Sequence, residues 1–480
     1  MFVGPSGAFA PGVPGERLRR QRLRPEKLLG CERRYREGFA TFELPTANAF
    51  YRAASKPVRD LGVLAALVWS EAIGERLRIA DLLAGPSAVR ALRYATETNA
   101  RAVLVNDAIS GPGRTVLERN TTGVSEDTVW IRRHDNLFDL AQSEEWIHSF
   151  DLIDLDAFGT GADEVASGVL NMLRCRRMKT AWSGNDDSAA EKDATAGALL
   201  YCCSTASVTA AGLNPGKAQK TYGAALVRHA AVHEQGLRLL ITVVRKHAQQ
   251  SGFIAQPLFS YFHRAGGTFR VMFRILQPRH DELALASTAA ADTGLLHLCQ
   301  QCGQLWCVTS TIKDTVASSV CPGCGNDAAA PQVRTSGPFY MGPLHDGDFV
   351  ERMLAVSREA PAGHFDRAAI AALKLMIHET RLNAHPFYYR VGDLARRARR
   401  SPPPISKLIE RLQWYERTYR ETRRMPEAVV RAQWQAARAS VDPQGVRTGL
   451  PIPAILSAVA EASAFRQQQQ QQQQRSRALL

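Results

Sequence analysis

The chain has 480 residues, 45% of them apolar and 22% charged, a composition typical of a globular protein large enough for two or three domains. Its longest apolar runs, such as residues 61–69, are too short to cross a bilayer, so we expect no membrane partner. The formal net charge of +14 favours a polyanionic partner, nucleic acid above all, although charge that only keeps a protein soluble would look the same.

The N-terminal segment is rich in arginine and poor in acids. We interpret residues 1–45 as a basic, poorly ordered arm rather than a transit peptide, because the serine enrichment of transit peptides is missing. The absence of a secretory signal and the spacing of the cysteines indicate an intracellular protein. Nucleus, mitochondrion and plastid all stay open.

Residues 46–290 alternate between helical and strand-like stretches. Helices are predicted over 59–75, with an apolar face, and over 88–98. Residues 269–276 alternate like a strand that could close a sheet. The other predicted strands cover 77–83, 102–105, 129–132, 150–155 and 198–203. This pattern predicts an α/β domain with a Rossmann-like parallel sheet, helices on both faces, and a ligand site at the carboxyl ends of the strands.

Acids follow four of these strands. The turn after the first begins at Asp81 and contains Gly85, which lets backbone approach a ligand closely. Asp107 follows the second strand, and Asp135 with Asn136 follows the third. Aspartate after a strand is common turn chemistry, but four in succession favour the cofactor site of a methyltransferase. A nucleotide-dependent oxidoreductase is the competing interpretation, and the missing Gly-x-Gly-x-x-Gly fingerprint argues against it.

The fourth strand leads into the most informative stretch of the chain. It ends in Asp156, which is followed by the small Ala157 and the aromatic Phe158. An acid can accept a hydrogen bond from an exocyclic amine, the next carbonyl can accept a second, and an aromatic ring can stack on a flat base. The triplet therefore indicates methylation of an amine with S-adenosylmethionine. Packing in the core is the alternative explanation for the aromatic residue.

Two Cys-x-x-Cys pairs predict a metal site in a C-terminal domain over residues 291–460. Each pair is followed by glycine, as in knuckles whose backbone amides point at sulfur. Four thiolates leave no open position on a tetrahedral ion, so we expect structural zinc. Its ligands are Cys299, Cys302, Cys321 and Cys324.

A basic cluster in the same region is a candidate contact with RNA phosphates, and a solvated helix face is the alternative explanation. It consists of Arg396, Arg397, Arg399 and Arg400. Residues 461–480 contain eight consecutive glutamines and read as a disordered tail.

These pieces, in this order, resemble the tRNA guanine-26 N2-dimethyltransferases from about residue 37 to 451. The matching pieces are Asn48-Ala-Phe-Tyr51, Val58-Arg59-Asp60-Leu61, Arg90-Ala-Leu-Arg93-Tyr94, Asn106-Asp107, Asp151 to Gly159, Lys220-Thr-Tyr222-Gly223-Ala224, His233-Glu234, the paired Cys-x-x-Cys, Gly342-Pro-Leu-His-Asp346, Pro402-Pro-Pro404 and Pro443-Gln-Gly445-Val-Arg-Thr448. The resemblance implies a class I methyltransferase sheet joined to a zinc-containing α+β domain that grips tRNA. It implies transfer of one or two methyl groups from S-adenosylmethionine to the exocyclic N2 of a guanine. We expect the chain to work as a monomer.

The resemblance also assigns roles to individual residues. Asp156 would orient the amine, and Phe158 and Phe50 would stack on the extruded guanine. Arg59, with Arg90 nearby, would meet the carboxylate of the cofactor. Its ribose and adenine would be held by Asp107 and Asp135.

Two departures from the family pattern leave other functions open. The family has proline where this chain has Ala157, so the turn loses the rigidity that proline gives to φ. The family also carries an acid after the fifth strand, and Thr205-Ala206-Ser207 has none. A non-catalytic RNA-binding relative, and an amino-methyltransferase acting on another RNA or on protein, are the alternatives.

Overall fold

The computed structural model describes twelve stretches of the chain: residues 26–27, 33–45, 51–98, 100–122, 128–157, 165–166, 168–179, 196–204, 214–278, 292–309, 320–421 and 435–464. Among these residues, no helix has the length and apolar character needed to cross a membrane.

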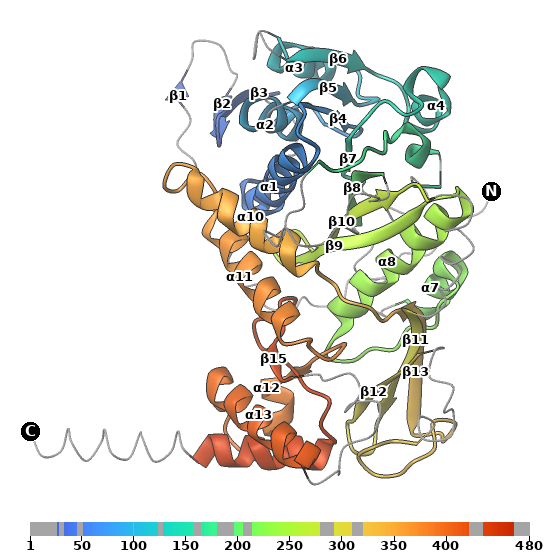
Figure 1. Cartoon of the computed structure of the whole chain (residues 1–480), viewed down its shortest axis with the longest axis vertical. Helices are drawn as coiled ribbons and strands as arrows, with labels where there is room; N and C mark the ends of the chain where they lie inside the picture. The colour runs from blue at the N-terminus through green and yellow to red at the C-terminus, as the bar shows by residue number, and fades with distance from the viewer. Residues whose placement is uncertain are drawn as a thin grey trace, which may run out of the picture.

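A seven-stranded sheet with the order β6-β5-β4-β7-β8-β10-β9 forms the centre of the first half of the molecule (Figure 1). Its strands are β4 (Leu77–Asp81), β5 (Ala100–Asn106), β6 (Val129–Arg133), β7 (Leu152–Leu155), β8 (Gly197–Ser204), β9 (Ile254–His263) and β10 (Thr268–Leu276). The five predicted parallel strands and the closing strand are all found, which confirms the α/β class.

The closing strand makes the sheet mixed rather than purely parallel. β10 lies between β8 and β9 and runs antiparallel to both. The reason is local: β9 and β10 are joined by only four residues, 264–267, and so short a turn requires an antiparallel pair. Gly267, with φ +61°, supplies the left-handed residue of this turn.

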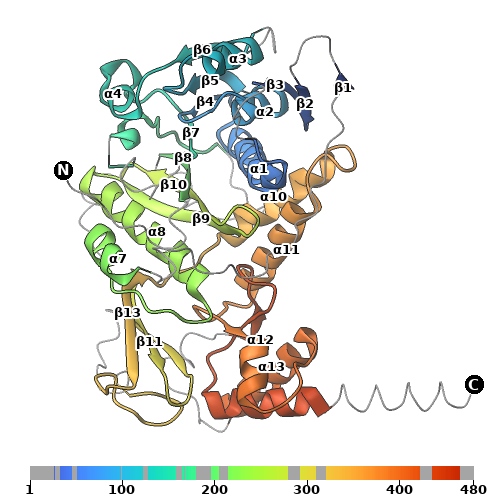
Figure 2. The same ribbon diagram turned by 180° about the vertical axis from the view of Figure 1, so that it is seen from behind.

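Helices cover both faces of the sheet, as the pattern predicts (Figures 1 and 2). α1 (Lys56–Ile73) corresponds to the predicted helix over 59–75 and ends at Gly74, whose φ is +63°. α1 and β4 are connected by only three residues, so they run in opposite directions and the start of α1 lies at the carboxyl end of β4. The other helices of this half are α2 (Val89–Glu97), α3 (Pro112–Asn120), α4 (Leu137–Gln142), α7 (Pro215–Tyr222) and α8 (Val232–Gln250).

A β-hairpin precedes α1 and corrects part of the predicted N-terminal arm. β2 (Arg33–Glu37) and β3 (Ala40–Leu44) pair with each other, and β1 (Glu26–Lys27) adds to β2. Phe42, which is buried, stacks on Tyr35 and lies edge-on to Tyr51. Residues 33–44 therefore belong to the packed structure, because their alternating apolar side chains cover α2.

The second half consists of two small sheets and a set of helices. The first sheet has the order β12-β11-β13, and the second has the order β14-β16-β15. An additional helix covers residues 452–464. The labelled elements are β11 (Thr293–Cys299), β12 (Leu305–Thr309), β13 (Val333–Tyr340), α10 (Gly347–Glu359), α11 (Arg367–Arg381), β14 (Tyr389–Arg390), α12 (Val391–Arg397), α13 (Ile405–Glu421), β15 (Ala437–Arg438) and β16 (Gly445–Arg447).

The apolar core runs across residue 290, the predicted limit between the two domains. Phe349 and Met353 of α10 and Met376 of α11 belong to the same buried cluster as Trp69 of α1. Figures 1 and 2 both show α10 and α11 lying beside α1. α1 is therefore buried on nearly all sides, because the sheet covers one face and these two helices cover another. The domain limits themselves stay a prediction.

Candidate active site

The predicted acids meet at the carboxyl edge of the sheet. Asp81 ends β4, and Asp154, the third residue of β7, is its neighbour in the parallel pairing. Asp156 follows two residues later, so its side chain points to the same face of the sheet as that of Asp154. Three carboxylates are thus concentrated in one small volume.

Two buried arginines hold the carboxylate of Asp156. Arg90 of α2 donates from Nε to Oδ2 at 2.9 Å, and Arg270 of β10 donates from Nη2 to Oδ1. Burial raises the pKa of Asp156, but the charges of Arg270 and Arg90 outweigh it and hold the pKa well below its ordinary value. The carboxylate is therefore an ionised hydrogen-bond acceptor with a fixed orientation.

Strand register explains how Arg270 reaches Asp156. Leu155 is opposite Cys202 on β8, and Cys203 is opposite Arg270 on β10. Asp156, Cys203 and Arg270 therefore lie at the same level of three neighbouring strands. The guanidinium group of Arg270 crosses β8 and packs over the ring of Tyr201, with 5.4 Å between the guanidinium carbon and the ring centroid.

The neighbouring acids are buried and only partly satisfied. Asp154 accepts hydrogen bonds from Tyr94 Oη at 2.8 Å and from Arg90 Nη1 at 3.3 Å. Asp81 Oδ2 accepts from the amide of Ala91, whereas its Oδ1 has no partner among the described residues. Burial, followed by the charge of Asp154, raises the pKa of Asp81 well above its ordinary value.

The turn after β4 lies against the turn after β5. Gly85, with φ +64°, donates its amide to Asp107 Oδ2 at 2.7 Å, and the amide of Ile109 donates to Oδ1. A Cβ atom at Gly85 would meet no atom within 4 Å, so the space beside this backbone is open. The two predicted cofactor residues are thus brought together.

The turn after β6 is tied to the same region because the side chain of Asn106 bonds to the backbone of Asp135. Asn106 Nδ2 donates to the carbonyl of Asp135, and Asn106 Oδ1 accepts from the amide of Asp135, both at 3.1 Å. The side chain of Asp135 is exposed. The side-chain oxygen of Asn136 accepts a hydrogen bond from the amide of Asp139 and so caps the N-terminus of α4. This structural role was not predicted from the sequence.

Arg59 already has a partner within the protein. Arg59 is buried, and its Nε donates to Glu37 Oε1 of the β2–β3 hairpin at 2.7 Å, so its guanidinium group already has a carboxylate partner. Phe50 and Phe158 lie outside the described residues. The roles that the resemblance gives these three residues stay predictions.

The four cysteines of the predicted metal site converge. Their sulfur atoms all lie within 4.8 Å of one another, with Cys299 and Cys324 3.6 Å apart and Cys302 and Cys321 3.5 Å apart. The glycine after each pair has positive φ, +85° at Gly303 and +79° at Gly325, and its amide donates back to the first cysteine of that pair. The donor set and its tight loops suit zinc.

The predicted arginine cluster lies on α12 and the turn that follows it, and all four side chains are exposed. Arg396 pairs with Asp393 at 3.2 Å. Arg397 lies against Gly303, because a Cβ atom on that glycine would be only 2.4 Å from the guanidinium carbon. The cluster therefore adjoins the four-cysteine site.

Comparison with known proteins identifies the family. A family model described as N2,N2-dimethylguanosine tRNA methyltransferase matches residues 32–176 and 186–460. The chain belongs to this family. The resemblance that the sequence motifs indicate is thereby confirmed.

Individual relatives agree with the family. The tRNA (guanine(26)-N(2)/guanine(27)-N(2))-dimethyltransferase of Aquifex aeolicus is 25% identical over 359 residues, which is 74% of this chain and 81% of the relative. The tRNA (guanine(26)-N(2))-dimethyltransferase of Thermococcus kodakarensis is 26% identical over 415 residues, or 82% and 94%. The structure of Trm1 from Pyrococcus horikoshii with S-adenosyl-L-methionine superimposes with a TM-score of 0.65 at 18% identity, covering 89% of this chain and 99% of the other, which shows the same fold.

Proposed function

We propose that this chain transfers methyl groups from S-adenosylmethionine to the exocyclic N2 of a guanine in tRNA, with position 26 as the target. Membership of the family supports the reaction class. The observation that carries the proposal is the carboxylate of Asp156, held by two arginines at the carboxyl edge of the sheet. Because tRNA is made and used inside cells, the proposal implies an intracellular protein.

Asp156 would act as an acceptor of a hydrogen bond from the guanine amine. Its two arginines fix the direction of the carboxylate, so the amine that it binds is fixed as well. Because Arg270 and Arg90 hold its pKa low, the carboxylate is a weak base. We therefore assign to Asp156 the orientation of the amine, and we assign the loss of the amine proton to solvent.

The residues around Gly85 suit the cofactor. S-adenosylmethionine, when bound, supplies an activated methyl group. The open space beside Gly85 admits a ligand, and the unpartnered Oδ1 of the buried Asp81 offers an acceptor to a donor group. Asp107 and Asp135, which follow β5 and β6, are the residues that would hold its ribose and adenine.

The four-cysteine site would hold zinc as a structural element. Tetrahedral coordination by four thiolates leaves no position for a reacting group. The site would fix β11 and the loop around residue 321, and with them the neighbouring arginine cluster.

Defined tRNA transcripts test this proposal. The wild-type protein should transfer radiolabelled methyl to a transcript with guanine at position 26 and not to a matched transcript with adenine there. Nucleoside mass spectrometry of the product would separate N2-methylguanosine from N2,N2-dimethylguanosine. The alternative, a non-catalytic RNA-binding relative, would bind the transcript but show no transfer and no heat of S-adenosylmethionine binding.

A further inference from the structure

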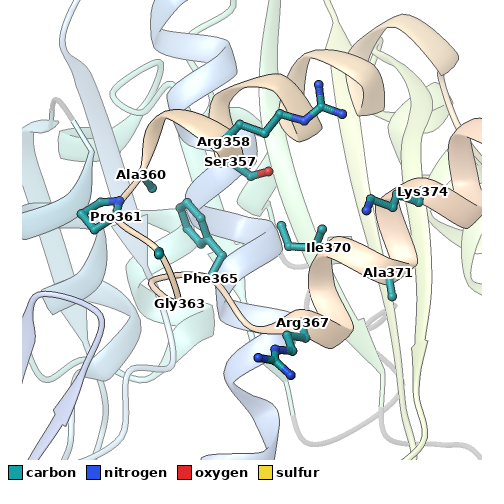
Figure 3. Close-up of a pocket in the computed structure, with 11 residues that line it drawn as sticks. Ser357, Arg358, Ala360, Pro361, Gly363, Phe365, Arg367, Ile370, Ala371 and Lys374 are labelled. Carbon is teal, nitrogen blue, oxygen red and sulfur yellow. The ribbon is translucent and has the colours of Figure 1, made fainter.

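A hollow lies in the corner between α10 and α11, away from the predicted arginine cluster. Its volume is about 640 Å³. Its lining includes Arg358 of α10, Arg367 and Lys374 of α11, and the apolar side chains of Phe365 and Ile370 (Figure 3). Its lining contains these three cationic residues and no aspartate or glutamate.

The three cations differ from the other arginines of the same helices. Arg352 of α10 pairs with Glu71, and Arg381 of α11 pairs with Glu351. Arg358, Arg367 and Lys374 form no ion pair within the described part of the chain, and their side chains are exposed. On the described residues of α10 and α11, the arginine and lysine side chains without an acidic partner all lie around the hollow. A site for an anionic ligand requires such unpaired positive charge.

The loop that forms the corner is held firmly against α1. Lys56 Nζ donates to the carbonyl of His364 at 2.6 Å, and the amide of Asp366 donates to Asp60 Oδ2 at 2.6 Å. Phe365 is buried, with the ring of His364 edge-on to it at 4.7 Å. The hollow is therefore fixed in position before any ligand binds.

The position of the loop relates the hollow to the active site. Its contacts are with the first turns of α1, and the start of α1 lies at the carboxyl end of β4, where Asp81 stands. The hollow thus lies toward the same end of the sheet as Asp156. A large polyanion that reaches Asp156 can also extend over this corner.

We propose that the hollow binds the phosphodiester backbone of tRNA during methylation, an inference that rests on the proposed function. Separate cationic side chains around an apolar floor can each neutralise one phosphate, and such contacts position a nucleic acid without reading its bases. Phosphate binding of this kind strengthens substrate and transition state equally, so the hollow raises affinity and leaves the chemical step unchanged.

The test compares the variant R358A/R367A/K374A with the wild type and with R381A, which removes a cation from the same α11 outside the hollow. Methylation of a full-length tRNA transcript and binding of that transcript would be measured from about 0.05 to 0.2 M salt. We expect KM and Kd of the triple variant to rise about tenfold with kcat unchanged. The slope of log K against log salt should fall by about 2 to 3, because roughly 0.7 to 0.9 is lost with each phosphate contact.

A second variant separates charge from folding. R358K/R367K keeps all three charges and should bind tRNA within about threefold of the wild type, since lysine meets phosphate as a point charge. Unchanged Kd and salt slope in a folded triple variant would overturn the inference, as would equal losses in R381A. If the wild type methylates and the triple variant behaves like it, only this surface is refuted. If the wild type binds tRNA through the hollow but transfers no methyl group, the proposed function fails instead.

Discussion

Replacement of Arg270 by glutamine tests the arrangement on which the proposed function depends. The change removes the charge that Asp156 Oδ1 contacts and leaves Arg90 on Oδ2. A hydrogen bond to a charged group contributes about 1.5–3 kcal/mol, and Asp156 would then be free to rotate about its remaining contact. If this contact stabilises only the transition state, in which the amine is aligned, its loss lowers kcat by about 10- to 150-fold. Affinity for S-adenosylmethionine should stay within about threefold, because Arg270 lies on β10, away from Gly85.

Single-turnover methylation and calorimetry of cofactor binding measure these two quantities. R270K keeps the charge and should recover part of kcat, whereas a side chain that only filled space would be replaced equally well by glutamine or methionine. In a D156N background, R270Q should lower whatever residual turnover remains no further, because both residues act on the same hydrogen bond. A folded R270Q variant with kcat within twofold of the wild type would refute the reasoning.

Three further outcomes follow from the site and the core. D156N should abolish turnover while cofactor affinity stays within a few-fold by calorimetry, and normal turnover would discredit the orienting role. C321S should release zinc and lower the melting temperature, with C175S, a cysteine outside the cluster, as the control; equal metal content in both variants would contradict the zinc site. Stability should also fall as the pH drops from 6.5 towards 4, because burial lowers the pKa of four histidines to about 4 and the unfolded chain takes up protons first. Each histidine adds a slope of at most about 1.4 kcal/mol per pH unit. Two buried acids with raised pKa, Glu416 at about 7 and Asp81, act in the opposite direction. Urea unfolding at about pH 7 and pH 5 measures the loss, and equal stability at both would count against it. The histidines are His229, His233, His345 and His385.

The sheet was predictable from sequence because each parallel strand is a short apolar run ended by a turn residue. β9 was not recognised, since its polar and aromatic residues, with Pro257 among them, hide the strand pattern. The composition of residues 33–44 hides the hairpin, because arginines surround the alternating apolar residues that are buried in it. The arginine-rich composition of this segment therefore hides the alternation of apolar and polar residues that is typical of a strand.

The active site was predictable where its residues directly follow strands. Asp156 and Asp107 follow strands, so their positions were fixed by the order of the elements. Arg270 was not predicted, because the register between β8 and β10 that places it opposite Cys203 cannot be read from spacing. The available signal was an arginine in a largely apolar strand, and Arg274 of the same strand carries that signal too. Asp154 carried a clearer signal, since it lies two residues before Asp156 on the same face.

The shared packing around α1 has a consequence for how the protein can be divided. Arg447 of β16 bonds both Glu234 of α8 and Glu379 of α11, so charged contacts reinforce the apolar ones that join the halves. A chain cleaved between β10 and β11 would stay associated as a complex of two fragments. Each fragment alone would expose apolar helix faces to solvent and leave charged groups without their partners. Either fragment made separately should aggregate, and mixing the two during refolding should restore a soluble particle.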